Sequence, residues 1–267
     1  VDADSLQFEI LVESDLQGMA IDLPAPLFKT AGVPDSLTAS VRFPTSGVLE
    51  VVAKSKSGIF GNLHFEKANS RWALQRGALN VGTLVPKLPE VQGLAVSGTF
   101  GGLSAEEWFA VASEYATTAE GGKPGNEDFL RELDIYAEDL QLFGYHFPES
   151  TVSALQVQGA WNLDIDGPRA SGSLTVPADF TGDKPLRADM SRLVLQSDKD
   201  ADVDPDPAVA DGFIDPRDLP SLSIRVADFV IDEMNFGKLD ASVLRTDLGM
   251  KSERIVTSSD TFNITID

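Results

Sequence analysis

Few side chains in this sequence have the chemistry of an active site. The sequence contains two histidines, His64 and His146, and no cysteine. The absence of cysteine excludes disulfides, zinc-thiolate sites, iron–sulfur sites and cysteine nucleophiles. Neither histidine lies near a G-x-S-x-G motif, so Ser-His-Asp catalysis is not indicated. His64 alternates outward from an expected strand and His146 falls at a turn or strand end, so we predict structural roles for both.

Acidic residues are the other candidate source of chemistry. Asp198, Asp200 and Asp202 have the spacing of the first three ligands of an EF-hand loop. The pattern then fails, because Val203 and Val209 stand where the loop needs Gly and Glu. We therefore expect a solvated loop here, with no metal and no cofactor. The 42 carboxylates leave a glycosidase-like acid/base pair open, but no spacing singles one out. We predict no catalytic residue and a protein that is not an enzyme.

Charge and composition narrow the classes of partner. The formal net charge is -21, which argues against nucleic acid and against electrostatic docking on anionic lipid head groups. Apolar contact with lipid tails stays open. Apolar residues make up 42% of the chain, enough to bury a core, and no run reaches the roughly 18 apolar residues of a membrane-spanning helix.

The dominant pattern is an alternation of apolar and polar residues with a period of two, typical of a strand with one buried face. Turn-forming residues separate the alternating runs, which indicates successive hairpins and an all-β fold. The clearest runs cover residues 6–10, 19–23, 37–43, 133–137, 161–165, 174–176, 193–195, 222–226 and 262–266.

One segment has a helical pattern instead. Ser104 and Glu107 fit a capping box, in which the serine hydroxyl accepts from the Glu107 amide. Apolar residues then recur on one helical face, at Trp108, Val111, Ala112 and Tyr115. We predict a helix near 104–117, ending before the Gly-rich stretch 121–125.

A weak internal repeat relates two strands 89 residues apart. Residues 133–140 align with residues 222–229, and both copies carry an Asp before the last apolar residue. Chance similarity between two alternating strands explains the match almost as well. A true repeat would suit a stacked, elongated assembly.

A sheet with one apolar face must cover that face. One helix covers about 10 Å of width and each strand adds about 4.8 Å, so the predicted helix can shield only two or three strands. The other strands must pack on a second sheet, close on themselves or curl into a trough that holds apolar ligand. A long curled sheet and a β-sandwich fit the alternation about equally well.

Several stretches resemble the YhdP proteins of the AsmA-like superfamily. The most specific are residues 14–29 and 161–177, supported by 91–100 with the helix after it and by 215–225. The matches keep their order over nearly the whole chain. The family's usual Gly before Lys29 is Phe28 here, a small departure in an expected turn.

The resemblance implies a periplasmic segment of an inner-membrane-anchored protein of Gram-negative bacteria, with the anchor outside this chain. The chain begins inside an expected strand and stops abruptly, so we also expect an excised or processed piece. The resemblance further implies a mainly β fold, an elongated curled antiparallel sheet forming a groove, with one or two short helices. We accordingly expect a β-groove segment over 1–197, an acidic Pro-rich loop over 198–220 and a continuing groove over 221–267.

The function implied is the movement of phospholipid between the inner and outer membranes, with acyl chains as the partner and envelope proteins as further partners. A structural or assembly module of the envelope that never holds lipid is the alternative. The family carries no catalytic residues over. The groove-lining candidates are one apolar strand face, represented by Leu133, Ile135, Leu140, Leu142, Leu174, Val176, Leu222, Ile224, Phe229, Phe262 and Ile264.

Overall fold

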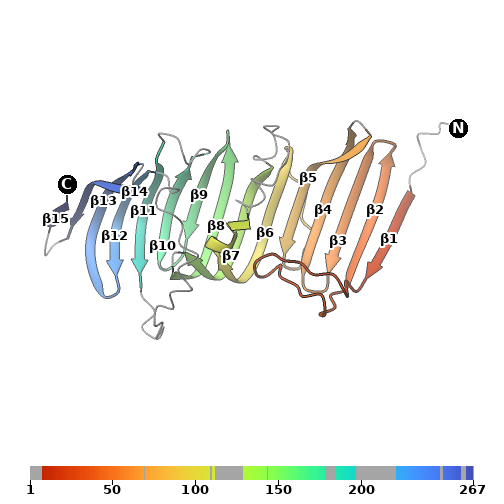
Figure 1. The fold of residues 1–267 in the computed structure, drawn as a ribbon, viewed down its shortest axis with the longest axis horizontal. Helices are drawn as coiled ribbons and strands as arrows, with labels where there is room; N and C mark the ends of the chain where they lie inside the picture. Colours follow the sequence, from red (N-terminus) through yellow and green to blue (C-terminus); the bar gives the residue numbers. More distant parts are fainter. Residues whose placement is uncertain are drawn as a thin grey trace. The chain divides into compact units, whose positions relative to one another are not determined.

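The chain forms one open β-sheet in a computed structural model that describes residues 8–68, 70–108, 110–111, 129–142, 144–177, 184–196, 221–246, 249–259 and 263–266. Fifteen strands follow one another in chain order from β1 to β15, and the sheet is not closed into a barrel (Figure 1). The prediction of a mainly β, mostly antiparallel fold is confirmed. The alternative of two packed sheets is wrong for the described residues, because all their strands belong to one sheet.

The chain divides into two compact units, residues 1–139 and 140–267, with the boundary inside β7. The first unit holds β1 (Phe8–Ser14), β2 (Leu37–Thr45), β3 (Val48–Ser55), β4 (Ile59–Ala68), β5 (Arg71–Val81), β6 (Gly93–Ser104) and most of β7 (Leu130–Leu142). The second holds β8 (Tyr145–Val157), β9 (Ala160–Asp166), β10 (Ala170–Val176), β11 (Leu186–Leu195), β12 (Leu222–Ile231), β13 (Met234–Thr246), β14 (Gly249–Ser258) and β15 (Asn263–Ile266).

Parallel neighbours interrupt the antiparallel order of the first unit. β1 to β5 pair as successive antiparallel neighbours, but β5 and β6 run in the same direction. A parallel step needs a connection that returns along the strands. Residues 82–92 make this return, and side chains of β4 and β5 hold them in place. The Asn62 amide donates to the Pro86 carbonyl at 3.0 Å, and the Arg76 guanidinium donates to the Pro89 carbonyl at 3.4 Å.

The predicted helix begins where expected, after β6. Residues 105–108 and 110–111 are helical, and the Glu107 amide donates to the Ser104 hydroxyl at 3.3 Å, which confirms the serine cap. Residues 112–117 of the predicted helix lie outside the described residues. β7 is again parallel to β6, because the Leu94 amide donates to the Phe129 carbonyl at 2.7 Å at the start of both strands.

The strand predicted over 19–23 is wrong. Within residues 15–36 the only ladder contact described is an isolated bridge between Ile21 and Lys29. Pro24 and Pro26 follow the alternating run and cannot donate to a ladder. The Lys29 ammonium then organises the segment from inside. This side chain is 9% exposed, and it donates to the carbonyls of Leu16 (2.8 Å), Met19 (2.7 Å) and Thr30 (3.2 Å).

The segment 15–36 is tied to distant parts of the first unit. The Ser57 amide and hydroxyl donate to the Asp35 carboxylate at 3.1 and 2.8 Å, at the β3–β4 turn. The Trp108 indole donates to the Ala25 carbonyl at 3.3 Å. Figure 1 shows the segment running along the lower ends of the first strands. It therefore borders one end of this part of the sheet and does not add a strand to it.

The second unit is antiparallel from β8 to β15 except for the parallel pair β11–β12. The predicted acidic loop 198–220, with its candidate calcium ligands, lies outside the described residues. The predicted division at 198–220 therefore stays a prediction.

The two copies of the weak repeat occupy equivalent places. β7 and β12 each follow a parallel neighbour, and in both strands the burial pattern shifts by one residue at the shared Asp. Ala137 and Leu140 are buried on either side of the shift in β7, as are Val226 and Phe229 in β12. In β12 the pairing register also shifts between Val226 and Phe229, the mark of a β-bulge. These shared features favour a real repeat.

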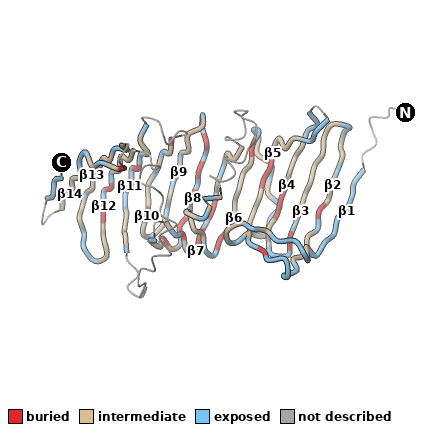
Figure 2. The backbone as a smooth tube through the Cα atoms, viewed as in Figure 1, coloured by how far each residue is buried: buried red, intermediate tan, exposed pale blue. Residues whose placement is uncertain are grey.

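Among the described residues the sheet buries no large apolar side chain completely. The buried stretches of the backbone are short and scattered (Figure 2). Many of the buried hydrophobic residues are alanines, and Ser150 is the largest fully buried side chain among the described residues. A filled sandwich core would bury its large aliphatic side chains completely. The described residues thus hold apolar side chains in place without sealing them from solvent.

The Lys29 contacts predict a specific stability effect. Replacing Lys29 with Met should lower the free energy of unfolding of the first unit by about 1–3 kcal/mol, because three part-buried carbonyls lose their donor. Chemical denaturation and amide exchange at Ile21 measure the change. Lys56→Met is the matched control at an exposed site. Equal stability of both variants would contradict this role of Lys29.

Candidate functional site

The main candidate site is one face of the second unit, called here the apolar face. Cross-strand pairing aligns one residue from each strand into a row that contains no polar side chain. At about 4.8 Å per strand, this row spans about 34 Å. The row consists of Ala154, Leu163, Leu174, Ala188, Ile224, Ala241, Ile255 and Ile266.

A neighbouring row two residues along each strand repeats the pattern. It contains one polar side chain, Thr257. Its members are Val152, Ile165, Gly172, Met190, Val226, Leu239, Thr257 and Ile264. The apolar face is therefore a two-dimensional patch that runs across every strand of the second unit.

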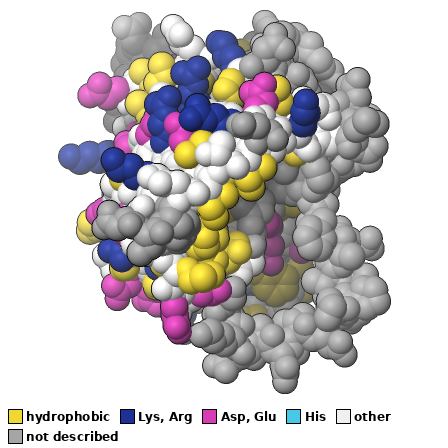
Figure 3. All heavy atoms as spheres, turned by 90° about the vertical axis from the view of Figure 1, so that its left-hand side faces the viewer, with side chains coloured by type: hydrophobic (Ala, Val, Ile, Leu, Met, Phe, Trp, Pro, Cys, Tyr) yellow, Lys and Arg dark blue, Asp and Glu magenta, His cyan; other side chains and the backbone are white. Residues whose placement is uncertain are grey.

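Exposure varies across this face: Val152, Met190 and Val226 of the neighbouring row are 7%, 8% and 3% exposed. Ala154, Ala188 and Ala241 are 4%, 4% and 7% exposed, shielded by their larger neighbours. Leu174 and Ile224 are only half-buried. Seen from the C-terminal end, hydrophobic side chains gather in a band beside a hollow (Figure 3). Leu174 and Ile224, with the exposed Ile264 and Ile266, thus keep apolar area accessible, and a patch of accessible apolar area marks interaction sites.

The opposite face of the same strands is charged. One step along the strands from the apolar row lies the row Ser153, Asp164, Ser173, Asp189, Arg225, Asp240, Val256 and Thr265. The Arg225 guanidinium lies 3.8 Å from the Asp189 carboxylate and 3.9 Å from that of Asp240. These side chains are 57–71% exposed, so their pairing adds little stability. The charged face keeps this side of the sheet in water.

Two cavities, of about 380 and 470 Å³, lie on the charged face and not on the apolar one. Both are lined by Asp189 and Arg225, one with the serines at 221, 223 and 242 and the other with Lys238 and Asp240. Exposed charged side chains, among them Asp189, Arg225 and Asp240, form part of their walls. We therefore regard both cavities as shallow depressions between charged side chains, and we place the candidate site on the apolar face.

The first unit has an apolar face of its own. Pairing aligns Ile10, Val41, Val51, Leu63, Gly77 and Leu94 in one row. A side chain at Gly77 would meet the Leu94 and Leu63 methyl groups at 2.9 and 3.1 Å. The row is therefore closely packed in its middle.

The structure brings several of the predicted site residues together. Leu174 and Ile224 share the apolar row, separated by Ala188. Val176 pairs with Trp161, and Leu222 pairs with Leu186 and Val243, in the next row. Beyond the bulge of β12, Phe229 pairs with Leu193 and its ring centroid lies 5.9 Å from that of Phe236.

The other predicted site residues lie at the ends of the face or outside it. Leu133, Ile135, Leu140 and Leu142 line β7, where Ile135 and Leu140 are buried and the other two half-buried. Ile264 lies in β15 and is 44% exposed. Phe262 lies outside the described residues.

The histidines behave as structural residues with one qualification. His64 lies in β4 on the face opposite the apolar row, as its alternation predicted, but only 12% of its side chain is exposed. Its ring nitrogens lie 4.0 Å from Glu50 and 3.6 Å from Glu66. The His146 carbonyl accepts a hydrogen bond from Arg169 at 2.8 Å. Within the described residues no group of three potential ligands could hold a metal ion.

Sequence reasoning missed the small and the aromatic members of these faces. Ala188 and Ala241 complete the apolar row but do not stand out in an alternating pattern. Phe8, Phe43 and Trp72 form a cluster in the first unit: the Phe8 and Phe43 rings stack at 4.5 Å, and Trp72 lies edge-on to Phe43 at 6.2 Å. The pairing of strands that are far apart in sequence creates this cluster. The sequence shows the aromatic residues but not that they lie together.

A family comparison covers the whole of this fold. The family model described as YhdP protein matches residues 1–267. The chain belongs to the YhdP family. This is a bacterial envelope family and not a known enzyme family.

The other comparisons add no named relative to the YhdP family match, because no curated protein and no solved structure matches the chain significantly. In the part of the chain that the structure describes, no helix is long and apolar enough to span a membrane.

The close packing around Gly172, in the neighbouring row of the apolar face, predicts the effect of adding a side chain there. Gly172 has a φ of +150°, and a Cβ there would lie 2.5 Å from the Met190 Cα and from the Asp189 carbonyl oxygen. Gly172→Ala should therefore lower the free energy of unfolding by at least about 2 kcal/mol. Gly102 has no heavy atom within 4 Å of its built Cβ, so Gly102→Ala should change it by less than about 0.5 kcal/mol. Denaturant unfolding tests both, and a harmless Gly172→Ala would contradict the packing.

Proposed function

We propose that this chain is a non-enzymatic, lipid-binding segment of a periplasmic path for phospholipid between the inner and outer membranes. In this proposal acyl chains lie against the apolar face, and the charged face stays in water. The observation that carries the proposal is the unbroken apolar row through Leu174 and Ile224, whose large side chains are only half-buried. Membership of the YhdP family, with its AsmA-like resemblance, supports the same conclusion.

The dimensions of the apolar face suit acyl chains. A strand of ten residues, such as β11 or β12, runs about 33 Å at 3.3 Å per residue. One leaflet of a bilayer is about 15 Å of hydrocarbon, so an acyl chain fits along a single strand. Burial of each methylene supplies about 0.8 kcal/mol, enough to hold a lipid without any specific polar contact.

The chemistry of the face also suits movement. Successive strands present similar aliphatic side chains, so neighbouring positions offer a lipid nearly equal binding free energy. A lipid on such a surface meets no single deep site that would hold it in place. The function proposed is therefore conduction along many equivalent positions, with the membrane anchor supplied by a part of the protein outside this chain.

Native mass spectrometry of the purified chain, with extraction and identification of bound lipid, tests the proposal. Wild-type protein should carry phospholipid or take it up from added vesicles. Leu174→Asp combined with Ile224→Asp should reduce bound lipid at least about tenfold, because a carboxylate on the face loses its hydration when acyl chains cover it. Circular dichroism should show unchanged strand content.

The matched control places the same charges on the other face of the same strands. Thr175→Asp combined with Ser223→Asp should leave lipid binding unchanged, because both residues lie on the opposite face from their neighbours Leu174 and Ile224. A wild-type protein that stays free of lipid and takes up none would overturn the proposal and favour a structural or assembly module.

A further inference from the structure

One end of the apolar face in the first unit is aromatic. The cluster of Phe8, Phe43 and Trp72 lies where β1 and β5 begin and β2 ends. Phe8 is 53% exposed and Trp72 is 40% exposed, although both pair within the sheet. Trp side chains favour places where an apolar surface meets water, because the ring is apolar and its N–H is polar. The cluster therefore marks the edge of the apolar face.

A cation lies beside this cluster on the same face. Lys67 pairs directly with Trp72, two residues beyond the pair Phe65–Leu74 on the apolar face. Directly opposed residues of an antiparallel pair point to the same side of the sheet. Lys67 is exposed, and its ammonium has no ion-pair partner among the described residues.

The neighbouring acidic residue does not neutralise this charge. Glu66 points to the other face, where its carboxylate lies 3.6 Å from the His64 ring. Among the described rows of the first unit's apolar face, from β1 to β6, Lys67 is a charged side chain among aliphatic and aromatic ones. In a chain with a net charge of -21, an unpaired cation at the edge of an apolar surface is a distinctive feature.

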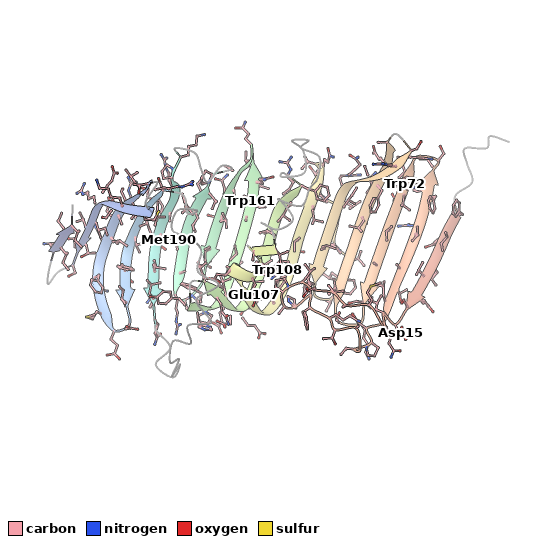
Figure 4. All side chains as sticks on the ribbon, viewed as in Figure 1. Asp15, Trp72, Glu107, Trp108, Trp161 and Met190 are labelled. Carbon is pink, nitrogen blue, oxygen red and sulfur yellow. The ribbon has the colours of Figure 1, made fainter. Side chains whose placement is uncertain are left out.

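The opposite ends of these strands have a different character. Figure 4 labels Trp72 at one end of the first unit's strands and Asp15 at the other. Asp35 also lies at that second end, beside the β3–β4 turn. Two lysines lie at this end: Lys29 already donates to three carbonyls, and Lys56 is exposed in the β3–β4 turn, next to the Ser57 that donates to Asp35. An anionic group would therefore meet carboxylates together with Lys56 at this end, and Lys67 beside the aromatic cluster at the Trp72 end.

We propose that the Trp72 end of the apolar face holds the phosphate of a bound phospholipid, with Lys67 as its partner. The inference rests on the proposed function and adds the orientation of the lipid to it. An ammonium–phosphate contact is a charge-assisted hydrogen bond, and the aromatic rings separate it from the aliphatic rows. From Lys67 to Ile59, eight residues of β4 run about 27 Å, more than the length of one acyl chain.

Binding of two matched lipids to the full chain tests the role of Lys67. The probes are a phosphatidylglycerol with palmitoyl and oleoyl chains and the diacylglycerol with the same chains. Lys67→Gln should weaken phosphatidylglycerol binding about fivefold, because it removes one exposed charge-assisted hydrogen bond, and change diacylglycerol binding less than twofold. Lys67→Arg should restore phosphatidylglycerol binding.

The control variant is Lys56→Gln, an exposed lysine at the opposite strand ends. It should leave the binding of both lipids unchanged. Equal effects of Lys67→Gln and Lys56→Gln, or an equal loss of both lipids in Lys67→Gln, would overturn the phosphate assignment alone. A wild-type chain that binds neither lipid would overturn the proposed function as well.

Fluorescence quenching measures the orientation directly. The signal of Trp72 is the difference between the wild-type chain and Trp72→Phe, which keeps an aromatic ring in the cluster. A phospholipid with a nitroxide on its head group should quench this signal more strongly than one with the nitroxide at the end of an acyl chain. The reverse order would overturn the orientation.

Discussion

The structure depends on one constraint: a single sheet exposes two faces, and the described residues supply no second layer for the apolar one. In an ordinary domain a second sheet or a row of helices would bury Leu174 and Ile224 completely. In the first unit the return segment 82–92 is held by Asn62 and Arg76, which lie on the opposite face from the apolar row through Leu63 and Gly77. The half-buried Leu174 and Ile224 and the charged reverse face follow from the lack of such a layer among the described residues.

The alternation of the sequence predicted the strands because a one-faced sheet imposes a period of two on each of them. The same rule failed at Met19, Ile21 and Leu23, because it takes no account of the prolines that follow. It also takes no account of Lys29, whose ammonium donates to three carbonyls. The parallel steps were equally invisible, because strand direction depends on where a connection returns and not on the pattern of the strand itself.

The sequence predicted that the candidate site is an apolar strand face, but it did not predict all the residues of that face. Leu174 and Ile224 were identified because large aliphatic residues stand out, whereas Ala188, which lies between them, did not. The aromatic end of the first unit joins Phe8 to Trp72 across three intervening strands and four pairings. Contacts of that kind depend on the register of every strand between them, and one sequence does not determine those registers. The resemblance to the YhdP family supplied what the pattern could not, the choice between an open sheet and a sandwich.

The parallel step before β7 and before β12 has a consequence for how such a protein can grow. The block from one parallel step to the next contains five strands of alternating direction, β7 to β11. Without the parallel step, the first strand of the next repeat would run in the opposite direction to β7. With it, β12 starts at the same end as β7. A gene that duplicates this block of 89 residues therefore lengthens the sheet while every copy keeps the same polarity.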